Sequence, residues 1–414
     1  MKKQFVKSSL KKQPSTYHIW QFLGLGLIFV GVVVAIAWLI VFYFHQQPLA
    51  SPVNQFSRFK FINNYFPIKK NKKKVYGFLP YWNLNRAQFN QNLTDVAYFR
   101  LAINNDGNVQ VTDDNKPEMG YKRLQSDQFL DIINQLDRKK INLEIVFTIF
   151  NDKTATKFLN SDEAKQEFLQ NLDSIILAYP VQGINLDVEL SATTGAQLKP
   201  QFTQFVQEVS NHLKTKPHKI QLSIDVYPSA TSGQHIWDLN ALAKSSDFII
   251  LMAYDFHQRG SSQAGPVAPI FSDGGGLASS IHNYLKKTLK QVPAEKLLLG
   301  IPFYGYQWQT VDHSEQANTY PDSGSTVLYR DLVKLLQQKD PSVTRHWNAK
   351  ALSPYLTYQQ DGKKYVVYYD DKNSIHYKLE LVNQLDLGGI AIWALGYEGG
   401  TEELWQEIGQ SLSK

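Results

Sequence analysis

The sequence contains no cysteine among its 414 residues. Thiol catalysis, disulfide bonds and cysteine-based metal sites are therefore excluded. The ten histidines form no cluster with metal-ligand spacing, and no glycine-rich phosphate loop follows the first predicted strand. We therefore expect no metal and no cofactor, and the missing phosphate loop disfavours a nucleotide-binding fold.

Acidic residues are absent from the first 74 positions, which carry 12 of the 43 Lys and Arg residues. The remainder of the chain therefore holds 31 basic and 37 acidic residues, although the whole chain has a net charge of +6. Because this larger part is mildly acidic, nothing in the charge pattern favours a nucleic-acid partner. The oligomeric state is left open by the sequence.

The N-terminal segment contains a long apolar run, and residues 22–44 carry no charge. A run of about 20 apolar residues is long enough to cross a hydrocarbon core of about 30 Å. We predict a cytoplasmic basic tail over residues 1–19, a transmembrane signal anchor over 20–44 and a basic linker over 45–74. The lysines before the span favour a cytoplasmic N-terminus, with the rest of the chain outside the cell membrane. A cleaved signal peptide is the alternative, which the length of the run disfavours.

From residue 75 onward, segments with strand-like and helix-like patterns alternate. The predicted strands are apolar runs bounded by turn signals, at 75–80, 94–103, 142–150, 182–189, 219–227, 246–254, 296–302 and 388–394. The predicted helices include 126–140, 161–178, 197–214, 277–290, 376–386 and 401–412. Eight β units with helices between them predict an α/β fold, a closed (β/α)₈ TIM barrel over residues 75–414. A doubly wound open sheet is the alternative.

The long gap between the seventh and eighth predicted strands, about 303–387, predicts a small α+β insertion on the barrel. Within it, Asp361-Gly362 separates two apolar-aromatic runs in 355–369, which is typical of a β-hairpin. We expect Asp370-Asp371, directly after the hairpin, to form a solvated turn.

The predicted strand 182–189 carries an unusual row of polar residues. Side chains alternate between the two faces of a strand, so Asn185, Asp187 and Glu189 share one face, opposite an apolar face. Strands of a parallel sheet are normally buried on both sides. Buried polar groups are costly unless they are paired or used, so this row predicts an active site.

Other strand ends, where barrel enzymes place their catalytic residues, also carry polar or aromatic residues. These are Tyr81, Trp82, Asn151, Asp225, Tyr227, Tyr254, Asp255, Tyr304 and Trp393. Together they predict a cup of aromatic side chains around several carboxylates. Trp308 remains undecided between this site and the core.

Several of these segments resemble glycoside hydrolase family 18, the chitinase and endo-β-N-acetylglucosaminidase family. Residues 183–189 resemble the signature DGxDxDxE of this family. VYGFLPYW, LMAYDFH, LGIPFYGYQW and GGIAIWALGYEG resemble its first, sixth, seventh and eighth strands, in the same order. The resemblance covers about residues 75–410 and is closest in character to the bacterial branch that acts on cell-wall or chitin-like glycans.

The resemblance implies roles for individual residues. Glu189 would be the general acid, and Asp187 would orient the 2-acetamido group of the substrate, whose oxygen attacks the anomeric carbon in place of an enzyme nucleophile. Tyr254 would hydrogen-bond the acetamido carbonyl, and Trp393 would form the floor of the cleft. Further residues expected to bind substrate are Asn185, Asp255, Tyr304, Tyr81, Trp82 and Tyr227.

Two positions depart from the family signature. Gln182 replaces its first Asp, and we expect it to lie low on the strand in a structural position. Asn185 replaces its middle Asp, which in the family pattern shares a proton with the next Asp. Since an amide does not titrate, we expect Asn185 to act as a neutral group that donates a hydrogen bond to Asp187.

The expected function is that of a membrane-anchored glycosidase outside the cytoplasm. It would hydrolyse β-linked N-acetylglucosamine-containing polysaccharide, chitin-like or peptidoglycan, by a retaining, substrate-assisted route. A catalytically inactive, lectin-like barrel and an envelope interaction protein are the alternatives. The sequence leaves open the polymer and the choice between endo and exo action.

Overall fold

The computed structural model describes residues 72–272, 279–338 and 340–412. The predicted tail, the predicted membrane span and nearly all of the predicted linker lie outside these residues. Within the described ranges, no helix combines the length and the apolar character needed to cross a membrane.

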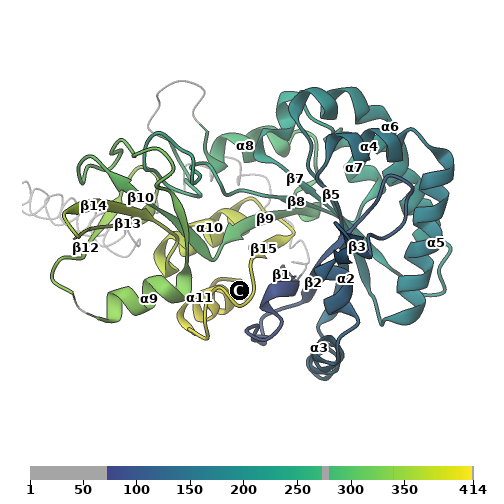
Figure 1. Cartoon of the computed structure of the whole chain (residues 1–414), viewed down its shortest axis with the longest axis horizontal. Helices are drawn as coiled ribbons and strands as arrows, with labels where there is room; N and C mark the ends of the chain where they lie inside the picture. Colours follow the sequence, from purple (N-terminus) through teal and green to yellow (C-terminus); the bar gives the residue numbers. More distant parts are fainter. Residues whose placement is uncertain (1–71, 273–278, 339, 413–414) are drawn as a thin grey trace, which may run out of the picture. The chain divides into compact units, whose positions relative to one another are not determined.

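Eight parallel strands close into a barrel, in the order β1-β15-β9-β8-β7-β6-β5-β2 (Figure 1). They are β1 (Lys74–Pro80), β2 (Asp95–Ala102), β5 (Asn142–Ile149), β6 (Gly183–Val188), β7 (Gln221–Val226), β8 (Phe248–Leu251), β9 (Leu297–Pro302) and β15 (Gly389–Trp393). Each predicted strand overlaps one of these. The predicted (β/α)₈ barrel is confirmed, and the open-sheet alternative is wrong.

Helices connect the barrel strands on the outside (Figure 1). They are α2 (Met119–Leu124), α3 (Asp127–Lys139), α4 (Asp152–Leu159), α5 (Asp162–Ala178), α6 (Ala192–Lys214), α7 (Leu239–Ser245), α8 (Ile281–Thr288), α10 (Lys372–Gln384) and α11 (Glu403–Leu412). Short 3₁₀ turns are η3 (Tyr81–Asn83), η4 (Pro228–Ser232) and η5 (Ala294–Lys296), and β3 (Thr112–Asp113) pairs with β4 (Lys116–Pro117). The helix predicted to start at residue 197 begins five residues earlier, at Ala192, and Ser191 is its N-cap. Thr-Thr-Gly, a run of weak helix formers, lies inside its first turns.

The predicted insertion contains an antiparallel sheet of order β11-β10-β14-β13-β12, with helix α9 between β11 and β12, whereas α10 in the same gap packs on the barrel strand β15. Its elements are β10 (Tyr304–Thr310), β11 (Ser325–Leu328), α9 (Tyr329–Gln337), β12 (Thr344–Asn348), β13 (Ser353–Gln360) and β14 (Lys363–Tyr368). Asp361 and Gly362 both have positive φ, 51° and 72°, as a type I′ hairpin turn requires. The predicted hairpin is confirmed.

The predicted solvated turn at Asp370-Asp371 is wrong, because both residues are buried. Lys378 Nζ binds Asp370 Oδ1 at 2.6 Å, and the Asp371 side chain caps the start of α10 through the backbone N–H groups of Asn373 and Ser374. Acidic residues after a strand can therefore cap a helix or pair with a buried lysine. Their local sequence does not distinguish these roles from that of a turn on the surface.

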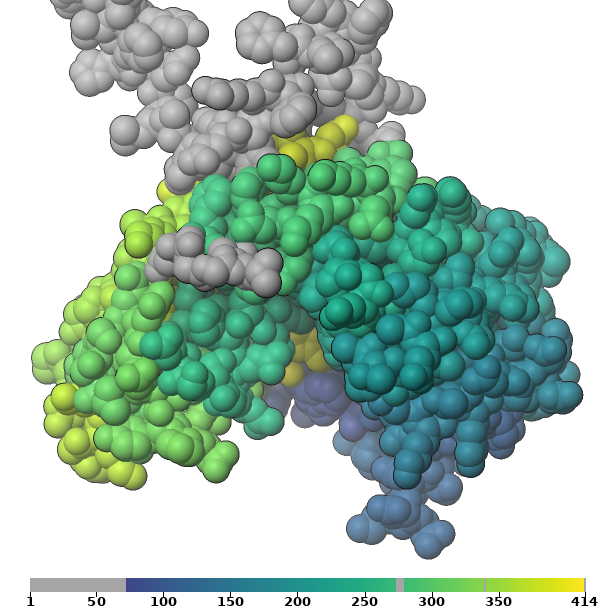
Figure 2. All heavy atoms as spheres, turned by 90° about the horizontal axis from the view of Figure 1, so that it is seen from above, coloured from purple at the N-terminus to yellow at the C-terminus, as the bar shows by residue number. Residues whose placement is uncertain are grey.

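One apolar cluster lies in the barrel and a second lies in the insertion. One fills the barrel interior, with Tyr76, Phe78, Ala97, Phe99, Val146, Ile250, Leu298 and Ala391. The other is the core of the insertion, and Tyr254 and Trp393 pack against it. The surface is hollowed between the green atoms of the insertion and the teal atoms of the barrel (Figure 2). The insertion therefore supports the strand ends from one side.

Candidate active site

Strand β6 places its polar row inside the barrel at three depths. Asn185 is 0% exposed and Asp187 is 3% exposed, whereas Glu189, one residue past the strand, is partly exposed. The Glu189 backbone N–H donates to Ile149 O at 3.1 Å, which holds this residue at the rim. Asn185 therefore lies deepest in the barrel and Glu189 lies at its rim.

Asn185 does not use its amide hydrogens on Asp187. Its Nδ2 donates to Ser223 Oγ at 3.0 Å and to Asp225 Oδ1 at 2.9 Å, both on the neighbouring strand β7. The Oδ1 atoms of Asn185 and Asp187 have no hydrogen-bond partner among the described residues. The expected hydrogen bond from Asn185 to Asp187 is therefore wrong, because two acceptors on β7 take both amide hydrogens.

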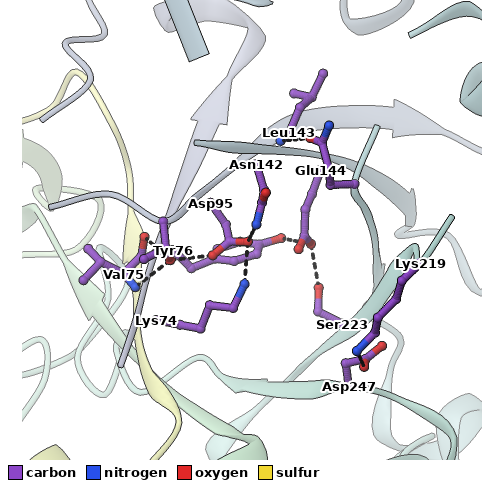
Figure 3. Close-up of polar contacts among 12 residues, drawn as sticks. Lys74, Val75, Tyr76, Asp95, Asn142, Leu143, Glu144, Lys219, Ser223 and Asp247 are labelled. Carbon is purple, nitrogen blue, oxygen red and sulfur yellow. Dashed lines mark hydrogen bonds and ion pairs between the residues drawn. The ribbon is translucent and has the colours of Figure 1, made fainter. Parts of the chain in front are cut away.

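Glu144, whose register partner on β6 is Gly183, two residues before Asn185, places a buried carboxyl group in the barrel interior (Figure 3). Glu144 Oε2 accepts from Tyr76 OH at 2.9 Å and from Ser223 Oγ at 3.2 Å. Burial, with the nearby charge of Asp95, raises the pKa of Glu144 to about 8. A Cβ at Gly183 would lie 2.4 Å from Glu144 Cδ, so this glycine leaves the space that the carboxyl group fills. Glu144 was not among the predicted site residues, although an acid within the apolar run NLEIVFTI was a signal.

Gln182 lies below the polar row, at the start of β6. Its Oε1 accepts from the Leu143 backbone N–H at 2.7 Å, and its own N–H donates to Leu143 O at 2.8 Å. The residue thus extends the pairing of β6 with β5, as expected for a structural position.

Asp187 sits among like charges in a dry environment. Burial raises its pKa well above the usual range, and the negative charges of Glu189 and Asp225 add to this effect. Arg100, on β2, opposes the increase; its guanidinium donates to Thr148 Oγ1 at 3.0 Å and lies 5.2 Å from the centre of the Phe150 ring. The net effect on the pKa of Asp187 is an increase. Arg100 was not among the predicted site residues.

Glu189 is held from the next strand. The hydroxyl of Tyr227, just after β7, donates to Glu189 Oε2. Burial raises the pKa of Glu189, whereas the hydrogen bonds with Tyr227 and Asp187 lower it, and the charge of Asp255 raises it again. The balance is an increase, which suits a carboxyl group that gives up a proton near neutral pH.

The loop after β8 supplies Tyr254 and Asp255. Asp255 adopts a left-handed backbone conformation, with φ of 61°, and accepts hydrogen bonds from the hydroxyls of Tyr304 and Tyr306 on β10. A Cβ at Gly300 would lie 2.5 Å from Leu251 O and 3.0 Å from Tyr254 Cε1, so this glycine makes room for the loop. Tyr254 is thus fixed against β9, and Asp255 is fixed by the insertion.

A cavity of about 450 Å³ opens in front of these groups. It is lined by Glu189, Tyr227, Pro228, Ser229, Met252, Tyr254, Asp255, Phe256, Gln258, Ser279 and Tyr284. Tyr304 does not line it and lies behind Asp255 as its hydrogen-bond donor. The cavity brings the candidate acid, Tyr254 and Asp255 to one surface that a ligand can reach.

A chain of aromatic rings lies beside Trp393 at the end of β15. The Trp393 ring is 4.7 Å from that of Phe99 and 5.6 Å from that of Phe78. Trp82, which is 44% exposed, packs against both Phe99 and Tyr81. Trp82 and Trp393 are therefore joined through Phe99, and Tyr81 belongs to the same group.

Two residues considered for the site have structural positions instead. Trp308 is fully buried in the insertion, and its Nε1 donates to the carbonyl oxygens of Gln258 and Arg259. Asn151 caps α4 by accepting from the backbone N–H groups of Lys153 and Thr154. In residues 72–272, 279–338 and 340–412, no three His, Cys, Asp or Glu side chains are placed to hold a metal ion.

Comparisons with known proteins agree with this architecture. The uncharacterized glycosylase YvbX of Bacillus subtilis (strain 168) is 27% identical over 285 residues, 66% of this chain and 75% of that protein. The cortical fragment-lytic enzyme of the same organism is 25% identical over 258 residues, 60% of this chain and 54% of that protein. A crystal structure of Ostrinia furnacalis Group IV chitinase in complex with allosamidin has a TM-score of 0.71 at 23% identity, covering 82% of this chain and 99% of that one. This last likeness shows the fold alone.

The family comparison covers most of the sequence. The model of the glycosyl hydrolases of family 18 matches residues 65–398, which contain every candidate site residue. The chain belongs to glycosyl hydrolase family 18, and the predicted enzyme class, a glycosidase, is confirmed.

Proposed function

We propose that this chain hydrolyses β-linked N-acetylhexosamine glycans, chitin-like or peptidoglycan, with retention of anomeric configuration. The observation that carries the proposal is the shared cavity. Glu189, Tyr254 and Asp255 line it, and Asp187 lies beside Glu189 in the barrel. A carboxyl group with a raised pKa at the rim is placed to protonate a leaving oxygen, and polar groups behind it are placed to hold a substituent of the sugar.

In the first step, Glu189 gives its proton to the glycosidic oxygen as the bond to the anomeric carbon breaks. The carbonyl oxygen of the 2-acetamido group of the substrate attacks that carbon, so the chain itself supplies no nucleophile. Tyr254 donates a hydrogen bond to the acetamido carbonyl, and Asp187 binds the acetamido nitrogen. Water then opens the cyclic intermediate, and Glu189 takes back a proton.

The relatives support this substrate class. One is named a cortical fragment-lytic enzyme, and one solved neighbour is a chitinase that binds allosamidin. The aromatic group that includes Trp393 and Trp82 offers apolar faces suited to sugar rings. The activity assay therefore tests chitin-like oligosaccharides and peptidoglycan as separate substrates.

The test is turnover by the full chain in detergent, with a chromogenic N-acetylchitooligosaccharide and with purified peptidoglycan. We expect release of reducing ends with the β anomer formed first, observed by proton NMR. Glu189→Gln is expected to lose about 10²–10⁴-fold in kcat because it removes the acid. Glu402→Gln, at an exposed position, is the matched control and should keep full activity.

Some outcomes would contradict the proposal. Equal activity of the wild type and Glu189→Gln would remove Glu189 as the acid. An initial α anomer would exclude retention. Glycan binding without turnover by the wild type would favour the lectin-like alternative.

We further propose that residues 20–44 anchor the chain in the cell membrane, with the barrel outside the cytoplasm. The uncharged run 22–44 and the lysines before it support this. Cells producing the full chain should hold it in the membrane fraction after an alkaline wash, and protease added to spheroplasts should digest the barrel. A full-length chain in the soluble fraction, or a protected barrel, would contradict the anchor or its orientation.

A further inference from the structure

Strand β2 is interrupted by a bulge at Arg100. Phe99 and Leu101 pair with two consecutive residues of the neighbouring strand β5, so Arg100 between them has no register partner there. Regular alternation would turn Arg100 away from the face on which Phe99 lies. A bulge changes the direction of a side chain, and bulges are common next to active sites. Here the bulge lets the guanidinium of Arg100 reach Thr148 Oγ1, which accepts from Nη1 at 3.0 Å.

Thr148 connects this guanidinium to the polar row of β6. The register partner of Thr148 on β6 is Asp187, and the side chains of register partners point to the same face of a sheet. Burial raises the pKa of Asp187, and the charge of Arg100 works against this increase. Arg100 therefore lies on the side of the barrel wall that carries the candidate catalytic residues.

Arg100 also lies over an exposed aromatic ring. Its guanidinium carbon is 5.2 Å from the centre of the Phe150 ring, and Phe150 is 44% exposed. The Phe150 ring stacks on that of Phe99 at 6.5 Å, and Phe99 contacts both Trp393 and Trp82. Arg100 therefore lies at the border of the aromatic group that is suited to sugar rings.

The guanidinium of Arg100 has no carboxylate partner in residues 72–272, 279–338 and 340–412. The ion pairs that arginines form there belong to Arg330 and Arg345. Thr148, its one side-chain acceptor in these ranges, is neutral and takes a single N–H donor. Arg100 is also the only residue of β2 that is not buried. The remaining donors of a permanently charged group are thus left at a place that a ligand can reach.

We propose that Arg100 is a specificity-determining residue that binds a carboxylate carried on the lactyl arm of muramic acid, and so favours peptidoglycan over chitin-like strands. This inference rests on the proposed function. A guanidinium presents a planar fork of N–H donors that matches a carboxylate. In peptidoglycan the lactyl arm ends in a free carboxylate or continues into an acidic peptide, whereas chitin has no acidic substituent. A sugar bound on the aromatic group brings its lactyl arm to the border where Arg100 lies.

The first experiment compares three forms of one peptidoglycan tetrasaccharide as substrates of the full chain. One form keeps its peptides, one has free lactyl carboxylates after amidase treatment, and in the third these carboxylates are coupled to methylamine. We expect kcat/KM for at least one acidic form to exceed that for the neutral methylamide by about tenfold, because a hydrogen bond between charged groups is stronger than one to a neutral amide. The preferred acidic form identifies the source of the carboxylate. Equal values for all three forms would overturn the proposal without any variant.

The second experiment assigns the preference to Arg100. Arg100→Gln should lower the ratio of kcat/KM for the acidic form to that for the methylamide by about tenfold. Arg100→Lys keeps the charge without the planar fork and should give an intermediate ratio. Arg138→Gln, at an exposed position on α3, is the matched control for the loss of one positive charge and should keep the wild-type ratio. An equal loss on acidic and neutral forms would mean that Arg100 acts through Asp187 or the fold, and it would overturn the proposal.

A third readout requires no turnover. In calorimetric titrations, Glu189→Gln should bind the preferred acidic form about tenfold more tightly than the methylamide. The double variant with Arg100→Gln should bind the two forms equally. Such a preference in a chain whose wild type hydrolyses no glycan would overturn only the proposed function. Turnover without a preference in rate or in binding would overturn only this inference. If Arg100→Gln does not fold, the ratio for Arg100→Lys decides, and a wild-type ratio in that variant would count against the proposal.

Discussion

Tyr227 donates its hydroxyl hydrogen to Glu189, so the candidate acid after β6 is held by a residue that follows β7. The Tyr227 ring is itself fixed, since it lies 5.0 Å from the ring of Trp237. The hydrogen bond from Tyr227 to Glu189 joins two residues that are 38 positions apart in the sequence. It orients the Glu189 carboxyl group, and it lowers the pKa of Glu189 against the effect of burial.

Removing this hydroxyl should move the pH dependence of the enzyme. In Tyr227→Phe the carboxylate form of Glu189 loses a donor, so its pKa rises and the alkaline limb of kcat/KM moves to higher pH, by about one unit. A profile that falls in height without moving would mean that Tyr227 acts on the substrate alone.

Adding one methyl group at Gly300 should displace Tyr254. The new Cβ would lie 2.5 Å from Leu251 O, a backbone atom, and 3.0 Å from the Tyr254 ring. We expect Gly300→Ala to lower the free energy of unfolding by about 1–3 kcal/mol and to lower kcat at temperatures where it stays folded. Gly260→Ala is the control, because nothing lies within 4 Å of its Cβ. Equal thermal stability and kcat in the two variants would contradict the prediction.

Glu144 should make stability depend on pH. Its pKa is raised from 4.5 to about 8 in the folded chain, so the folded state binds the proton more tightly than the unfolded state. The resulting stabilisation is complete below pH 4.5 and is lost as the pH rises toward 8. In urea unfolding, the wild type should therefore lose stability relative to Glu144→Gln across this window, by up to about 1.4 kcal/mol per pH unit. A constant difference between the two proteins would contradict the raised pKa.

Replacing only one member of the buried ion pair between Lys378 and Asp370 should lower the stability of the folded chain. Lys378→Met leaves Asp370 without its cation in a buried site, and we expect it to lower the free energy of unfolding by about 3–5 kcal/mol. The double variant with Asp370→Leu removes both charges and should regain most of the loss, measured by thermal or urea unfolding. A single variant as stable as the wild type would show that Asp370 takes up a proton at little cost.

The barrel strands followed from local sequence because their apolar runs are short and bounded by turn residues, and all eight were located. The hairpin of β13 and β14 followed from Asp361-Gly362 for a similar reason, since few residue pairs accept two positive φ angles. Helices α2, α4, α7 and α9 were missed, and three of them are of eight residues or fewer, too short for a clear apolar period.

The sequence by itself determined the depth of the polar row on β6, because alternation along a strand is a local property. Which groups the row contacts was decided by tertiary structure. Asn185 could have donated to Asp187 on its own strand, but the register of β6 with β7 places Ser223 and Asp225 within reach of both amide hydrogens. Barrel closure likewise brings Glu144 and Tyr76 together below them. Contacts between strands depend on register and on closure of the sheet, and neither is encoded within the single stretch 182–189.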